Sequence, residues 1–138
     1  MRDVPRQLTV DELAELFSGR TRFVERLAQE DDPLGRARDV ARELSEDEKV
    51  EALAAHPRIG ERSPEQHGDD PAVLSELVEL NRAYEERYGF RFVVFVNGRQ
   101  RREIVPILRE RMQRSREEEL STAVDELVQI AINRWQAS

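Results

Sequence analysis

Helix start signals recur along this chain of 138 residues with little sequence between them. Capping boxes, in which a Ser or Thr is followed three residues later by Glu, begin at Thr9, Ser45 and Ser115. Asp-Pro steps at 32–33 and 70–71 add two further starts, because proline suits the first position of a helix. Apolar residues follow these starts at helical spacing, so the sequence predicts a chain made mostly of helices.

The helical pattern has two clear ends and one interruption. Pro57 disfavours helical backbone angles at the preceding residue, so we expect a helix to end at His56. Gly89 is placed to terminate the next long helix. Residues 90–96, FRFVVFV, have the β-branched and aromatic content of a strand, but the chain offers no second strand. The backbone groups of this segment must be satisfied by packing or by a ligand, and the sequence leaves both alternatives open.

The region after this segment combines one more predicted helix with a high density of arginine. Residues 104–112 have helical apolar spacing, in which Pro106 is tolerated only if it lies in the first turn. The stretch from Arg99 to Arg116 holds seven arginines, interspersed glutamates and no aromatic residue. Because the net charge is −7, we expect a solvated helix face here and not a nucleic-acid surface.

Composition excludes several classes of site. The chain has no cysteine, which rules out disulfides, thiolate catalysis and cysteine-ligated zinc. The N-terminal residues contain no apolar run of signal-peptide length, and no stretch approaches the roughly 20 apolar residues of a membrane span. We therefore expect one domain over residues 1–138, in a cytoplasmic protein that binds neither membrane nor nucleic acid.

Both histidines lie in one stretch of thirteen residues, HPRIGERSPEQHG at 56–68. The position of His56 between a helix and a proline would hold its imidazole on rigid backbone, and histidine suits proton transfer near neutral pH. Glu65 either returns to face this imidazole or is an ordinary acid in the first turn of a helix, and Gln66 can hydrogen-bond a polar ligand. A third alternative makes His56, Glu65 and His67 metal ligands, although their spacing matches no H-E-x-x-H pattern.

Arg134 lies on the apolar face of the last predicted helix, where Leu127, Ile130 and Arg134 follow i, i+3, i+7 spacing. A guanidinium in such a place normally needs an anionic partner. It forms a structural ion pair, or extends its stem over apolar surface to reach solvent near the C-terminus, or acts as a clamp for an anionic substrate. The sequence leaves these alternatives open.

Four blocks of the sequence match a known family pattern. They are HPRIG at 56–60, EQ at 65–66, LNRAYEERYGFRFVVFVNGR at 80–99 and IAINRW at 130–135. In these blocks the chain resembles the OHCU decarboxylases, which act on 2-oxo-4-hydroxy-4-carboxy-5-ureidoimidazoline in urate breakdown. The likeness covers most of the chain and weakens over the first 45 residues.

The resemblance implies an all-α fold, a compact single-domain bundle of about seven to nine helices with one short extended segment near 90–96. It also implies a homodimer and a reaction that uses neither a metal nor an organic cofactor. The family's catalytic histidine and acid fall on His56 and Glu65. Its substrate-binding positions, of which the last four act through the backbone, fall on Pro57, Gln66, Arg134, Phe92, Val93, Val94 and Phe95.

Two departures from the family pattern concern the mouth of the predicted site. Family members commonly have a longer insertion than residues 61–64 provide, and Ser63 does not stand where the family has its serine. His67 replaces a residue that is usually small. The resemblance predicts cofactor-independent decarboxylation to (S)-allantoin. Two alternatives are a decarboxylase or tautomerase of another small heterocyclic acid, and a helical interaction module that retains the fold without turnover.

Overall fold

The computed structural model describes residues 7–58 and 71–137. Within these residues the chain forms seven helices and no β-strand, which confirms the all-α prediction at the low end of the expected helix count. The helices are α1 (Val10–Leu16), α2 (Arg22–Leu27), α3 (Pro33–Glu43), α4 (Glu46–Ala54), α5 (Pro71–Tyr88), α6 (Arg101–Arg111) and α7 (Arg116–Ala137). In this part of the chain no helix is both long enough and apolar enough to cross a membrane.

The helices begin where the capping residues predict. At α1 the Thr9 hydroxyl accepts a 3.1 Å hydrogen bond from the Glu12 N–H, and the Glu12 carboxylate accepts one of 3.0 Å from the Thr9 N–H. The serine boxes at the starts of α4 and α7 form the same reciprocal pair. Asp32 caps α3 by accepting a 3.2 Å bond from the Gly35 N–H. Each cap satisfies N–H groups that a first helical turn leaves without an intrahelical partner.

The two predicted helix ends are also confirmed. α4 ends just before His56, whose N–H donates a 3.1 Å hydrogen bond to the Leu53 carbonyl. α5 ends at Tyr88, and Gly89 follows with a left-handed φ of +80°. Because glycine has no side chain, it adopts this φ at little cost and turns the chain out of the helix.

The position of Pro106 differs from the prediction, because it is the sixth residue of α6 and not part of the first turn. The helix starts early because the Gln100 N–H donates a 2.8 Å hydrogen bond to the Glu103 carboxylate. A proline in the second turn has no N–H for the carbonyl four residues before it. The helix continues through it because Ile104 and Leu108, on either side, are fully buried and hold the helix in place by packing.

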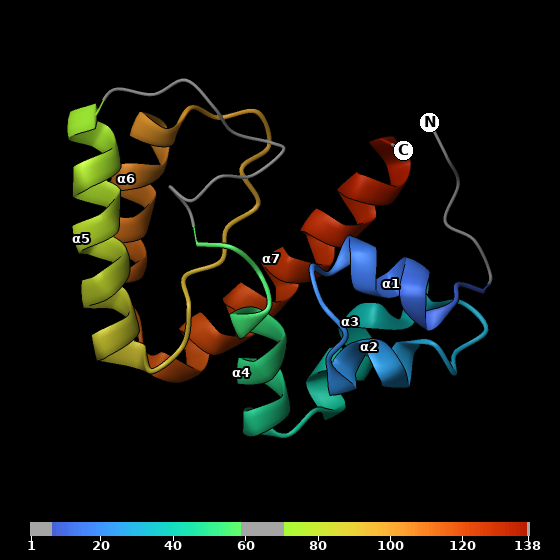
Figure 1. Cartoon of the computed structure of the whole chain (residues 1–138). Coiled ribbons are helices and arrows are strands. Elements are labelled where there is room, and N and C mark those ends of the chain that lie inside the picture. The colour runs from blue at the N-terminus through green and yellow to red at the C-terminus, as the bar shows by residue number, and fades with distance from the viewer. Residues whose placement is uncertain (1–6, 59–70, 138) are drawn as a thin grey trace.

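The helices form two groups that α7 connects (Figure 1). Helices α1 to α4 pack on one another and on α7, while α5 and α6 pack side by side. The connection between α5 and α6, residues 89–100, runs between the α5–α6 pair and α7 before it turns back into α6 (Figure 1). This connection therefore lies where the two groups meet.

Residues 91–96 form neither a helix nor a strand, so the strand-like composition of this segment does not give a strand. Phe92, Val93 and Val94 of this segment are buried, as is Phe90 just before it, so its apolar side chains are used for packing. The Tyr84 ring of α5 meets the Phe92 ring edge-on, with 5.3 Å between the ring centroids. β-Branched and aromatic residues favour half-buried surfaces generally, and a strand is only one of the structures that provide one.

The arginine-rich stretch is not a uniformly solvated face, so that prediction is wrong for part of it. Arg101 and Arg111 are each only 6% exposed. Arg111 is buried with specific partners: its Nε lies 2.8 Å from the Glu119 carboxylate, and its guanidinium carbon lies 4.6 Å from the centroid of the Phe92 ring. These partners come from other segments, so the density of charge along the sequence does not reveal them.

Candidate active site

A cavity of about 210 Å³ opens between the end of α4, the connection after α5 and the last turns of α7. It is lined by His56, Pro57, Arg58, Phe92, Val93, Val94, Phe95, Val96, Asn97, Gly98, Ile130, Asn133 and Arg134. The structure thus brings together every sequence-predicted site residue that lies in the described part of the chain. The other predicted positions, Glu65 and Gln66, lie outside the described residues, as does His67.

His56 reaches the cavity from the turn that follows α4, and its backbone is held on both sides. Its N–H donates to Leu53, and its carbonyl accepts a 2.8 Å hydrogen bond from Nη1 of Arg91. Arg91 directly precedes Phe92, so this bond ties the histidine turn to the segment that forms another wall of the cavity. The half-buried His56 is therefore carried on backbone with little freedom to move, as a proton-transfer group requires.

Arg134 reaches the cavity from the last turn of α7 and is half-buried. Its Nη1 donates a 2.7 Å hydrogen bond to the Ser18 hydroxyl and one of 3.1 Å to the Leu16 carbonyl, both at the C-terminal end of α1. The last carbonyls of a helix lack intrahelical partners and carry partial negative charge, which makes them good acceptors for a guanidinium. A helix end therefore supplies part of the negative potential that this arginine needs.

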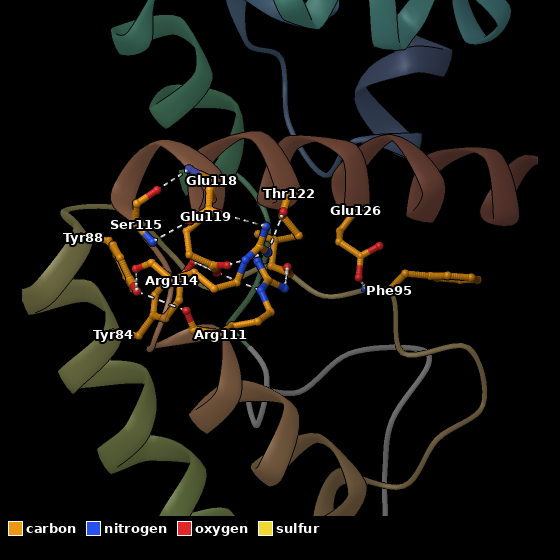
Figure 2. Close-up of polar contacts among 11 residues, drawn as sticks. Tyr84, Tyr88, Phe95, Arg111, Arg114, Ser115, Glu118, Glu119, Thr122 and Glu126 are labelled. Carbon is orange, nitrogen blue, oxygen red and sulfur yellow. Dashed lines mark hydrogen bonds and ion pairs between the residues drawn. The ribbon is translucent and has the colours of Figure 1, made fainter.

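The segment that forms the third wall is fastened by charged side chains. The Val93 carbonyl accepts a 2.8 Å hydrogen bond from Nη1 of Arg111. The Phe95 N–H donates a 3.3 Å bond to the Glu126 carboxylate, which projects from α7 toward it (Figure 2). The Phe95 carbonyl accepts a 2.5 Å bond from Nη2 of Arg99. Side chains thus replace the neighbouring strand that this segment lacks.

Three N–H groups of the same wall are candidate contacts for a ligand. Among residues 7–58 and 71–137, no group accepts a hydrogen bond from the N–H of Phe92, Val93 or Val94. All three residues are buried and line the cavity. Buried N–H groups nearly always have a partner, so the alternative in which the segment offers backbone groups to a ligand concerns these positions.

A buried carboxylate behind this wall organises the surrounding side chains (Figure 2). Glu119 of α7 is 0% exposed and accepts hydrogen bonds of 2.6 Å from the Tyr84 hydroxyl, 2.8 Å from Arg111 and 3.0 Å from Arg114. Burial and, to a smaller extent, the hydrogen bond to Glu119 raise the pKa of Tyr84, so its hydroxyl stays protonated and donates. Three donors around one carboxylate provide the partners that a buried charge requires.

The cavity is lined by an imidazole, a guanidinium and the backbone segment that carries these N–H groups. An imidazole can accept or deliver a proton near neutral pH, and the two kinds of donor can bind a carboxylate or a developing oxyanion. In the described ranges no three His, Cys, Asp or Glu side chains are grouped as metal ligands would be. The metal alternative depends on Glu65 and His67, which lie outside those ranges. The described groups suit a reaction in which negative charge develops on a small molecule.

Several lining residues are not singled out by the sequence: Arg58, Val96, Asn97, Gly98, Ile130 and Asn133. Asn133 adjoins Arg134 within the block IAINRW, and this adjacency is the signal that could have found it. Asn97 and Gly98 have left-handed φ angles of 51° and 76°, as an Asn-Gly pair predicts for a turn. The turn signal does not indicate that the turn borders a cavity.

Comparison with known proteins gives a consistent picture. A family model described as "OHCU decarboxylase" matches residues 2–136. A curated relative, the "Uric acid degradation bifunctional protein" of Bacillus sp. (strain TB-90), is 36% identical over 62 residues. That match covers 45% of this chain and only 12% of the relative.

Two solved structures are similar to this chain. A crystal structure of OHCU decarboxylase in the presence of (S)-allantoin has a TM-score of 0.78 and 26% sequence identity, covering 89% of this chain and 94% of that one. A crystal structure of (S)-allantoin synthase has a TM-score of 0.72 and 22% identity, covering 93% of this chain and 48% of that one. The second match supports the fold alone.

Proposed function

The chain belongs to the OHCU decarboxylase family, and we propose that it decarboxylates 2-oxo-4-hydroxy-4-carboxy-5-ureidoimidazoline to (S)-allantoin without a cofactor. The observation that carries the proposal is the shared cavity, which is lined by His56, Arg134 and residues 92–95. The similar structure obtained with (S)-allantoin supports the choice of product.

The reaction requires stabilisation of charge and one proton. When the bond to the carboxylate carbon breaks, CO2 leaves and the electron pair stays on the ring, where the adjacent imine and carbonyl system delocalises it. A proton then completes the product, so atoms and charge balance without an oxidant or a reductant. Because the substrate contains its own electron sink, an enzyme needs only to stabilise the developing anion and deliver the proton to one face.

His56 is the proton-transfer group of the proposal. It removes or relays the proton of the substrate hydroxyl and assists reprotonation after CO2 has left. Glu65 orients this imidazole and binds the ureido or hydroxyl group, and Gln66 hydrogen-bonds a polar edge of the ring. The roles of Glu65 and Gln66 rest on the family resemblance. The role of His56 is supported in addition by its place in the cavity and its anchored backbone.

Arg134 and the backbone of residues 92–95 hold the ring in the proposal. A guanidinium pairs with a carboxylate or a planar carbonyl acceptor through a fork of N–H donors. Backbone N–H donors on a rigid segment stabilise a developing oxyanion without reorganising during the reaction. Pro57 completes the apolar part of the wall beside His56. These donors approach the ring from two different walls, which fixes the face that receives the proton.

The cavity also bears on the alternatives. A cavity of about 210 Å³ that mixes charged, backbone and apolar groups suits a single-ring metabolite. A helical interaction module has no need for such a cavity. Another small heterocyclic acid would bind in the same cavity. Only an assay with 2-oxo-4-hydroxy-4-carboxy-5-ureidoimidazoline therefore separates that alternative from the proposal.

The decisive assay generates the substrate in place from urate with purified upstream enzymes and follows (S)-allantoin by circular dichroism. We expect the wild-type protein to accelerate the appearance of (S)-allantoin above the spontaneous decay of the intermediate. For His56→Ala we expect a loss of about 100-fold or more in rate, because proton transfer contributes on this order, with no change in the fold.

Glu65→Ala and His67→Ala complete the test. The proposal predicts a severe rate loss for Glu65→Ala and a minor one for His67→Ala. Equal loss in both, together with stoichiometric zinc or iron in the purified protein, would instead support the metal alternative. Wild-type rate in His56→Ala would refute the proton-transfer role, and ligand binding without product would indicate another heterocyclic substrate.

The proposal retains three expectations from the sequence. These are a homodimer, a cytoplasmic location and a single domain over residues 1–138. Light scattering after size-exclusion chromatography tests the first, because a homodimer of a 16.1 kDa chain has twice that mass. Limited proteolysis tests the third, since a single domain has no internal linker that is cleaved before the rest.

A further inference from the structure

The residue that follows the C-cap of α1 has an unusual backbone. Phe17 is the C-cap, and Ser18 follows it with a left-handed φ of 66°. The Gly19 N–H then donates a 2.9 Å hydrogen bond to the Ala14 carbonyl, the long bond of a Schellman motif. Glycine is the usual residue at the left-handed position of this motif, because any side chain there is strained. A serine in that place therefore calls for a reason beyond helix termination.

The hydroxyl of Ser18 supplies such a reason. It accepts the 2.7 Å hydrogen bond from Nη1 of Arg134, and the Leu16 carbonyl accepts a bond of 3.1 Å from the same nitrogen. The left-handed turn is what allows a hydroxyl and a carbonyl two residues apart to converge on one nitrogen. Glycine would make the turn equally well but has no acceptor to offer.

The next residue of the same turn contacts the helix that carries the histidine. A Cβ added to Gly19 would lie 2.9 Å from the Cβ of Ala55, closer than such atoms approach in real structures. Ala55 is the C-cap of α4 and directly precedes His56. The turn therefore contacts both Arg134, which lines the cavity, and Ala55, which directly precedes the cavity residue His56.

We propose that Ser18 and Gly19 form a positioning turn, in which Ser18 aligns the guanidinium of Arg134 for the substrate and Gly19 allows close packing against Ala55 beside His56. The inference rests on the proposed function, because it requires Arg134 to bind the substrate. Ser18 acts through Arg134 and is a positioning residue, not a catalytic one. Its alignment of a donor fork matters because bidentate recognition depends on the orientation of the guanidinium plane.

Three substitutions of Ser18 separate alignment from stability. Ser18→Ala removes the hydroxyl and keeps the strained φ, whereas Ser18→Gly removes both the hydroxyl and the strain. We expect both variants to raise KM about tenfold, the effect of losing a hydrogen bond to a charged group, with a smaller change in kcat. Ser18→Gly should nevertheless have a melting temperature at or above that of the wild type. If Ser18 had a purely structural role, a higher KM would be accompanied by a lower melting temperature.

Ser18→Asn is the rescue variant, because asparagine tolerates a left-handed φ and its side-chain oxygen can accept a hydrogen bond. We expect it to recover most of the wild-type KM. Ser121→Ala, the same chemical change at an exposed position of α7, is the matched control and should leave KM unchanged. In an Arg134→Ala background, Ser18→Ala should have no further effect on KM, because the two residues act as one unit.

The outcomes separate this inference from the proposed function. A wild-type protein that makes no (S)-allantoin overturns both. An active wild type with an unchanged KM in Ser18→Ala and Ser18→Gly overturns only the positioning role. The same conclusion follows if KM in the three Ser18 variants tracks the melting temperature, or if Ser18→Ala raises KM equally with and without Arg134.

Discussion

Arg111 donates a 2.8 Å hydrogen bond from its Nη1 to the carbonyl of Val93, and so connects a buried cation to the backbone of the cavity wall. Its Nε lies 2.8 Å from the carboxylate of Glu119, which is fully buried. One guanidinium thus shares its donors between a structural ion pair and the segment that lines the cavity. The position of that segment is therefore coupled to the stability of the network behind it.

Arg111→Met should be strongly destabilising. The substitution leaves Glu119 buried without one of its cationic partners and removes the bond to Val93. Breaking one side of a buried ion pair costs about 3–5 kcal/mol, and urea unfolding measures this loss directly. Arg109→Met is the matched control two residues away on α6, because Arg109 pairs with Glu76 at an exposed position. That control should cost about 0–1 kcal/mol, and equal losses in the two variants would show that burial of Arg111 contributes nothing.

Tyr84→Phe tests the hydroxyl that faces the same carboxylate. Burial raises the pKa of Tyr84, so its hydroxyl is a proton donor to Glu119 at neutral pH. We expect a loss of about 1.5–3 kcal/mol in the free energy of unfolding, as for hydrogen bonds to charged groups.

Tyr88→Phe is the comparison for Tyr84→Phe. The Tyr88 hydroxyl lies 3.1 Å from the Arg111 carbonyl and 2.7 Å from the Arg114 carbonyl, and both acceptors are neutral. Its loss should therefore cost only about 0.5–1.5 kcal/mol. A larger loss in Tyr88→Phe than in Tyr84→Phe would contradict the order that the charges predict.

The helices and one part of the site can be predicted from the sequence because their signals are local. The hydroxyl of Thr9 caps the helix that begins beside it, and Gly89 ends the helix that precedes it. Pro57 acts on the backbone of His56 in the same way, so the sequence predicts a histidine at the end of a helix. Arg134 can be recognised in the sequence because it is a charged residue on an otherwise apolar helix face. The blocks shared with the family add the grouping of these residues in one site.

The contacts that hold the site together cannot be predicted in this way, because they join distant segments. Arg134 and its acceptor Leu16 are 118 positions apart, and no local pattern pairs them. The same reason explains why the arginine-rich stretch is misread as a solvated face. Arg111 differs from the exposed Arg109 through its contacts with Glu119, Val93 and Phe92, which other segments supply. Composition likewise predicts a strand at 90–96, although side chains from α6, from α7 and from Arg99 of the same connection serve as its hydrogen-bond partners.

Gly19→Ala should disturb the packing between the turn after α1 and the end of α4. The new methyl group would lie 2.9 Å from the Cβ of Ala55, so one of the two segments must move. Overpacking of this kind costs about 1–3 kcal/mol, measured as a lower midpoint of urea unfolding. We also expect a lower kcat, because Ala55 supports the backbone of His56.

Ala55→Gly in the Gly19→Ala background provides the control. It removes the methyl group that the new side chain meets, so it should restore most of the lost stability and activity. Ala55→Gly alone should cost at most about 1 kcal/mol, the usual helix penalty of glycine, since Ala55 lies at the end of its helix. Additive losses in the double variant would show that the two positions do not interact.

Acid should destabilise the protein through carboxylates that accept backbone hydrogen bonds. The Glu51 carboxylate of α4 accepts a 2.8 Å bond from the N–H of Arg22, the first residue of α2. This bond, with smaller contributions from the Arg22 side chain, lowers the pKa of Glu51 below its ordinary value of 4.5. Hydrogen bonds from Ser45 and Ser115 lower the pKa values of Glu48 and Glu118 in the same direction.

The direction of these shifts fixes the sign of the pH dependence. A carboxyl whose pKa is lower in the folded protein binds its proton more readily when unfolded, so its contribution to stability is fully present above the unfolded pKa. That contribution is lost as the pH falls from about 4.5 through the lower folded pKa. We expect Glu51→Gln to lower the free energy of unfolding at pH 7. The same substitution should flatten the decline of that free energy below about pH 4.5, measured by urea unfolding. A Glu51→Gln profile that runs parallel to that of the wild type would contradict the assignment.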